Sequence, residues 1–93
     1  MHFMEVKKNL TIINKLGLHA RAASKLVATA SRYESRIIID RNGQEADAKS
    51  IMSVLMLAAS QGTDLVVTAS GPDADEALEQ IEALIHDRFE ETE

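Results

Sequence analysis

The feature that most constrains the fold is the change of hydrophobic period along the 93 residues. From Val6 to Ile13 most apolar residues stand at every second position, which is typical of a half-buried strand. From Ala20 to about Tyr33 they recur at spacings of three and four, which indicates one buried face of a helix. Strand and helix patterns then alternate along the rest of the chain. The chain is therefore neither all-α nor all-β.

The second half of the chain has clear turn signals. The β-branched run Arg36–Asp40 predicts a strand. Asn42-Gly43 is the strongest short hairpin signal, and it returns the chain through a short polar strand over 44–47. The remaining predicted elements are a helix over Ser50–Ala59, a strand over Asp64–Ala69, and a last helix that opens on Asp73-Ala74-Asp75-Glu76, which resembles a capping box.

The predicted order is β-α-β-β-α-β-α. It favours an α+β open-faced sandwich, in which a four-stranded antiparallel sheet has three helices on one face and water on the other. We find no linker, so residues 1–93 form a single domain. With three aromatic residues in the chain, the core should be aliphatic. The acidic tail from Phe89 to Glu93 is expected to be solvated and frayed.

Composition excludes several classes of function. The chain has no cysteine, which excludes thiol chemistry and disulfides and suits the cytoplasm. A net charge of -5 with few aromatic residues argues against nucleic-acid binding. No apolar run is long enough to span a membrane, and the N-terminus lacks the features of a signal peptide. Met4 is an alternative start to Met1. We see no metal ligand set and no cofactor motif.

The stretch from Gly17 to Arg21 predicts a phosphate site. If a helix begins after His19, this imidazole lies at the helix N-terminus, where the free N–H groups of Ala20 and Arg21 favour an anion. A neutral imidazole nitrogen is a nucleophile, and the Arg21 guanidinium is a fork of donors for phosphate oxygens. On its own, such a histidine is more often an ordinary surface residue.

The predicted helix after Ser50 has more apolar surface than one core-facing stripe needs. Ser50 is a good N-cap. Two interpretations stay open: a short helix buried on two sides, or a docking patch for another protein that includes Ile51, Met52 and Leu55, with flexible methionine suited to varied partners.

These motifs together resemble a known family. The residues that carry the resemblance are Gly17-Leu18-His19-Ala20-Arg21, Ala48-Lys49-Ser50-Ile51-Met52 and Gln61-Gly62-Thr63, within the same order of elements. The chain resembles the HPr phosphocarriers of the bacterial phosphoenolpyruvate-dependent phosphotransferase system. The stretches Ile13–His19 and Ile51–Ala59, with the acidic tail, look like its nitrogen-related (NPr-like) branch.

The resemblance implies a mechanism and partners. Nδ1 of His19 would take a phosphoryl group from Enzyme I and pass it to an EIIA-type protein, with Arg21 stabilising the added charge. Ser50 matches the serine that an HPr kinase/phosphorylase modifies in some bacteria, although it can equally be only a cap. Lys49 would add positive charge near the docking patch. The family implies a monomer that forms transient complexes and acts as a stoichiometric carrier rather than a free-standing enzyme.

One residue departs from the family pattern. Ala22 stands where the family usually has proline after the arginine. Alanine is the best helix former, so the helix start should survive the change.

Two further functions remain open: a regulatory module that only docks partners through the Ser50–Ala59 helix, and a small enzyme with His19 as general base. The enzyme is disfavoured because no second catalytic group is visible.

Overall fold

The computed structural model describes residues 4–93, so the choice between Met1 and Met4 as the start lies outside the described residues. The predicted order is confirmed, with one short 3₁₀ helix added. The elements are β1 (Met4–Thr11), α1 (Ala20–Ala30), β2 (Arg36–Arg41), β3 (Gln44–Asp47), α2 (Ile51–Met56), β4 (Asp64–Gly71), α3 (Ala74–His86) and η1 (Arg88–Glu90).

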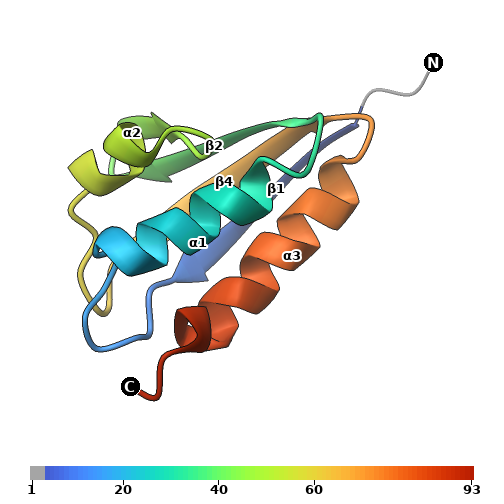
Figure 1. Ribbon diagram of the computed structural model, residues 1–93. Helices are drawn as coiled ribbons and strands as arrows, with labels where there is room; N and C mark the ends of the chain where they lie inside the picture. Colours follow the sequence, from blue (N-terminus) through green and yellow to red (C-terminus); the bar gives the residue numbers. More distant parts are fainter. Residues whose placement is uncertain (1–3) are drawn as a thin grey trace.

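The four strands form one sheet in the order β1-β4-β2-β3, and every pairing is antiparallel. Figure 1 shows α1 and α3 lying side by side across one face of this sheet. Alternate residues of β4, from Leu65 to Gly71, are buried on that face, whereas Val66, Thr68 and Ser70 are half-exposed on the other. The predicted open-faced sandwich is therefore confirmed.

The core lies between the sheet and the helices. Ile37 and Ile39 of β2, Leu26 of α1 and Ile81 of α3 are fully buried there. The core is not wholly aliphatic as predicted, because Phe89 of η1 is also fully buried. None of the helices within residues 4–93 is long and apolar enough to cross a membrane.

The prediction of a capping box at Asp73 is wrong, because the capping hydrogen bond of the Asp73 side chain does not form. Asp73 is nevertheless the N-cap of α3. Its carboxylate instead accepts hydrogen bonds from the Glu34 N–H at 3.0 Å, and from the N–H and hydroxyl of Ser35 at 2.9 and 2.5 Å. Asp73 therefore joins the start of α3 to the turn before β2.

These hydrogen bonds give Asp73 an acid-dependent role in stability. The Ser35 hydroxyl, with the Glu34 N–H next, lowers the pKa of Asp73 below its usual 3.8. A lowered folded-state pKa stabilises the fold above the unfolded pKa, and this contribution is lost as the pH falls through the folded value. In urea unfolding between pH 5 and 2, we expect Asp73→Asn to be less stable at pH 5 and to lose less stability on acidification. A parallel loss in both proteins would contradict this, and Asp75→Asn, on the exposed first turn of α3, is the control.

Candidate functional site

His19 lies where the sequence predicts it, at the N-cap of α1. Its backbone is extended, with φ -77° and ψ 179°, and its carbonyl accepts the first helical hydrogen bond from the Ala23 N–H at 2.8 Å. Nδ1 of its ring accepts a hydrogen bond from the Arg21 N–H at 3.3 Å. The imidazole is therefore held at the positive end of the helix dipole, with 30% of its side chain exposed.

Gly17 allows the chain to reach this position. Its φ is +69°, in the left-handed region that side chains disfavour. A Cβ at this residue would lie 2.6 Å from the carbonyl oxygen of Ala59, which is too close. The next residue, Leu18, donates its N–H to this same Ala59 carbonyl at 2.8 Å. Glycine is thus required where the segment before α1 packs on the segment after α2.

The C-terminal tail is not frayed, and that prediction is wrong. After α3 the chain turns through η1, where Arg88, Phe89 and Glu90 all have positive φ. The buried Phe89 ring anchors this turn, and Lys25 of α1 donates from Nζ to the Phe89 carbonyl at 2.8 Å. The tail therefore packs back against α1.

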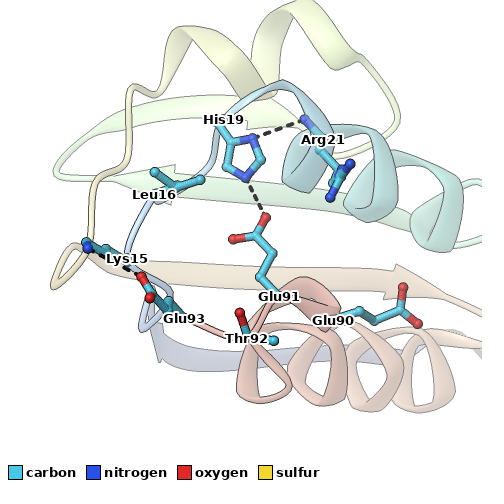
Figure 2. A pocket seen from close by; sticks show the side chains of 8 residues that line it. All are labelled: Lys15, Leu16, His19, Arg21, Glu90, Glu91, Thr92 and Glu93. Carbon is cyan, nitrogen blue, oxygen red and sulfur yellow. Dashed lines mark hydrogen bonds and ion pairs between the residues drawn. The ribbon is translucent and has the colours of Figure 1, made fainter.

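This return places a carboxylate on the histidine. Glu91 Oε2 lies 2.5 Å from Nε2 of His19. Its other oxygen, Oε1, accepts a hydrogen bond from Nδ2 of the buried Asn14 at 2.9 Å. Asn14 Nδ2 also donates to the Gly17 carbonyl at 2.9 Å, so two acceptors fix the orientation of this amide. Figure 2 shows the His19 ring between Glu91 and the backbone of Arg21.

These contacts select one tautomer of the neutral imidazole. An ionised carboxylate can only accept a hydrogen bond, and a backbone N–H can only donate one. Nε2 of His19 must therefore have the proton that points to Glu91, and Nδ1 keeps the lone pair that faces the Arg21 N–H. The nitrogen with nucleophilic character is Nδ1.

The surroundings of Glu91 favour its ionised form. The hydrogen bond from Asn14 is the largest influence that lowers the pKa of Glu91, and the hydrogen bond from His19 adds to it. Desolvation acts in the opposite direction without reversing the shift. Glu91 is therefore an acceptor at neutral pH.

A pocket of about 540 Å³ opens beside the imidazole. Lys15, Leu16, His19 and Arg21 line one side, and residues 90–93 line the other. Within residues 4–93 the Arg21 guanidinium forms no ion pair, and Figure 2 shows it beside the ring. The pocket thus presents a nucleophilic nitrogen and a planar cation to an incoming anion.

A set of exposed apolar side chains lies on α2 and on the loop before α1. We call it the apolar patch, and it consists of the exposed side chains of Leu16, Ile51, Met52 and Met56. Met52 and Met56 are 67% and 68% exposed. Leu55, which the sequence places in a docking patch, is half-buried against the core. Leu55 therefore fits the interpretation of a buried helix, whereas the exposed Ile51, Met52 and Met56 fit the interpretation of a docking patch.

Ser50 and Lys49 have structural contacts of their own. Ser50 is confirmed as the N-cap of α2, and its hydroxyl accepts from the Ser53 N–H at 3.3 Å. Lys49 is half-buried, and its Nζ donates to the Tyr33 carbonyl at 2.7 Å. The Lys49 ammonium group is therefore tied to the end of α1 rather than free in solvent.

Comparison with known proteins identifies the family. The family described as "PTS HPr component phosphorylation site" matches residues 6–87. The chain belongs to the HPr family. It is 49% identical to the phosphocarrier protein HPr of Cupriavidus necator, over 95% of this chain and 99% of that protein. It is 41% identical to the phosphocarrier protein NPr of Shewanella violacea, over 94% and 96% of the two chains.

Solved structures agree with this HPr-family assignment. A crystal structure of HPr from Thermoanaerobacter tengcongensis superposes with a TM-score of 0.92 at 38% identity and covers 95% of this chain and 99% of that one. Another structure from the same organism, described as an HPr dimer, has a TM-score of 0.76 at 40% identity and covers 88% and 94%. The fold of this chain is therefore that of solved HPr structures.

Two residues of this HPr-family site were missed by the sequence analysis. The sequence analysis gives Asn14 no role and places Glu91 in a solvated tail. Glu91 is 72 residues away from His19 along the chain, and Asn14 is linked to the ring through its hydrogen bond to Glu91. The one available signal was Phe89, a large apolar residue in an otherwise acidic tail, which is a candidate for an anchor.

Proposed function

We propose that this protein is a phosphocarrier of the phosphoenolpyruvate-dependent phosphotransferase system. It takes a phosphoryl group on Nδ1 of His19 from Enzyme I and passes it to an EIIA-type protein. The observation that carries the proposal is the tautomer of His19, because its contacts with Glu91 and Arg21 leave the lone pair on Nδ1. The protein is consumed and regenerated in each cycle, so it acts as a stoichiometric carrier and not as a free-standing enzyme. We propose that it does so in the cytoplasm.

The added phosphate has partners in the pocket. A phosphoryl group on Nδ1 replaces the hydrogen bond from Arg21 with contacts between its oxygens and the N–H groups of the first turn of α1, those of Ala20 and Arg21. The Arg21 guanidinium lines the same pocket, and in this proposal it swings onto these oxygens. These contacts stabilise the phosphate only in part, which suits a carrier that must also release it.

Mass spectrometry after incubation with Enzyme I and phosphoenolpyruvate tests the proposal. We expect one added phosphate, labile in acid and stable in base, on the peptide that contains His19. An unchanged mass with active Enzyme I would reject the phosphocarrier and favour a regulatory module that only docks partners. Size-exclusion chromatography of the protein alone, in which we expect a monomer, tests the proposed assembly state.

We propose that Enzyme I and the EIIA-type protein dock on the apolar patch. The patch flanks the site, because the loop that contains Leu16 lines the pocket and α2 packs against α1. Apolar side chains with this exposure suit a transient interface. Lys49 supports the surface through its bond to Tyr33. Phosphorylation of Ser50 would add negative charge at the edge of the patch and weaken docking.

A charge placed in the apolar patch should separate binding from stability. We expect Met52→Glu to raise the Kd for Enzyme I at least about tenfold, since a buried carboxylate at an interface must lose its hydration. The free energy of unfolding should change by less than about 0.5 kcal/mol, as is usual for an exposed position. Isothermal titration calorimetry measures the binding. The matched control is Ala83→Glu, which places the same charge on the exposed side of α3. Equal weakening by both variants would reject the patch.

A further inference from the structure

Several contacts hold the Glu91 side chain in its position beside His19. The backbone is fixed both before and after Glu91. Before it, the Phe89 ring is buried and its carbonyl accepts from Lys25. After it, the Glu93 carbonyl accepts from the Lys15 N–H at 2.7 Å. The side chain itself is oriented by the buried Asn14.

The neighbouring acidic residues of the tail have other partners. Glu90 pairs with Lys25 at 2.9 Å, and Glu93 pairs with Lys15 at 3.3 Å. Both carboxylates are well exposed, with 65% and 69% of their side chains accessible. Among the three glutamates of residues 90–93, the one on the imidazole is Glu91, which is also the least exposed.

We propose that Glu91 is a positioning residue for phosphotransfer at His19. This inference rests on the proposed function and goes beyond it. The carboxylate holds the proton on Nε2 and the ring in place, so that Nδ1 offers its lone pair to the incoming phosphorus. Asn14 supports this role because it fixes the carboxylate through Oε1.

No proton has to move during the phosphoryl transfer. The Nδ1 lone pair forms the N–P bond, and the bond between phosphorus and the donor group of Enzyme I breaks, with its electron pair going to the donor. Nε2 keeps its proton, so the phosphorylated ring is cationic and lies against the Glu91 carboxylate. When the acceptor of the EIIA-type protein attacks phosphorus, the N–P electron pair returns to Nδ1. A protonated ring is a good leaving group, so the same contact assists both transfers.

Glutamine at position 91 is the sharpest test. Its side chain has nearly the same shape but offers one acceptor oxygen and one NH₂ group. Asn14 Nδ2 and His19 Nε2–H are both donors, so in Glu91→Gln one of them faces the NH₂ group. Glu91→Ala removes both contacts. The matched control is Glu82→Gln on α3. It also removes one glutamate charge, but Glu82 pairs with Lys8 and does not line the pocket.

Two measurements on the full-length proteins separate positioning from mere structure. The ¹⁵N chemical shifts of the His19 ring report its tautomer at a pH where the ring is neutral. We expect the Nε2–H form in the wild type and in Glu82→Gln, and a mixture in both Glu91 variants. The initial rate of phosphate uptake from Enzyme I and phosphoenolpyruvate should fall about tenfold or more in the Glu91 variants, because part of the population lacks a lone pair on Nδ1. Circular dichroism confirms folding, and Glu91→Gln serves if Glu91→Ala does not fold.

Each outcome decides one question. A changed tautomer together with slower uptake, in the Glu91 variants alone, supports the positioning role. An unchanged tautomer, or uptake within twofold of the wild type, overturns it. Equal loss in Glu82→Gln also overturns it and assigns the effect to the net charge of the protein. If the wild type takes up no phosphate from active Enzyme I, the proposed function fails, and the positioning role fails with it.

Discussion

Replacing His19 with alanine should abolish phosphate acceptance from Enzyme I and leave the fold intact. Within residues 4–93, the imidazole is the one neutral nitrogen nucleophile in the pocket, and alanine offers no atom that can form the N–P bond. The side chain is 30% exposed, and after the loss of its contact with His19 the Glu91 carboxylate still accepts a hydrogen bond from Asn14, so the loss of stability should be modest. Uptake of radiolabelled phosphate from phosphoenolpyruvate measures the first effect, and urea unfolding measures the second.

His86→Ala is the matched control for this experiment. His86 is an exposed histidine in the last turn of α3 and does not line the pocket. We expect it to accept phosphate at the wild-type rate. Residual labelling of the His19→Ala protein would place the phosphate on another residue, and equal loss in both variants would point to damage of the fold.

Replacing Phe89 with alanine should cause the largest loss of stability among single changes in the tail. The ring is fully buried, and removal of a buried aromatic side chain costs about 3–5 kcal/mol. The ring also offsets the strain of three consecutive residues with positive φ, from Arg88 to Glu90. Without this anchor the tail detaches, so the contact between Glu91 and His19 is lost as well. Urea unfolding at 25 °C gives the free energy, and the His19 tautomer reports the detachment.

Phe89→Leu and Glu90→Ala are the controls for the Phe89 experiment. Leucine keeps most of the apolar contact and should cost clearly less than alanine. Glu90 is exposed on the same turn, so its replacement should change the free energy of unfolding by less than about 0.5 kcal/mol. If Phe89→Ala unfolds at the wild-type urea concentration, the tail does not contribute to the core, and the prediction fails.

The fold was predictable because its elements have strong local signals. Asn42-Gly43 does connect β2 and β3, and both residues have the positive φ that this turn needs. The β-branched residues of β2 and the apolar face of α1 are buried as their spacing indicates. His19 at the start of α1 follows from the same local pattern, so the position of the proposed nucleophile could be predicted from the sequence.

The end of α2 shows why boundaries were less accurate. The sequence predicts a helix up to Ala59, but α2 ends at Met56 and Ala58 has a φ of +50°. Its last carbonyls accept from side chains of neighbouring strands: Arg41 donates to the Leu57 carbonyl at 3.0 Å and Gln44 to the Met56 carbonyl at 3.1 Å. These donors are distant in sequence, so helix propensity alone cannot detect them.

The tail shows the same limit at the site. Four of its residues are acidic or polar, and local reasoning therefore assigns it to solvent. Its place is decided by the burial of Phe89 and by donors from Asn14, Lys15 and Lys25, which belong to the N-terminal third of the chain. Only the tertiary structure reveals that this segment completes the environment of His19.

The burial of Phe89 also has a consequence for the time course of folding. β1 pairs with β4, from Met4 with Gly71 to Thr11 with Asp64, so the first strand has no partner until β4 has been synthesised. The core remains open until residue 89 is available to fill it. Nascent chains that stop short of this point should expose apolar surface and unpaired strand edges, which chaperones recognise. The environment of His19 is thus complete only after Glu91, which follows the histidine by 72 residues, has been synthesised.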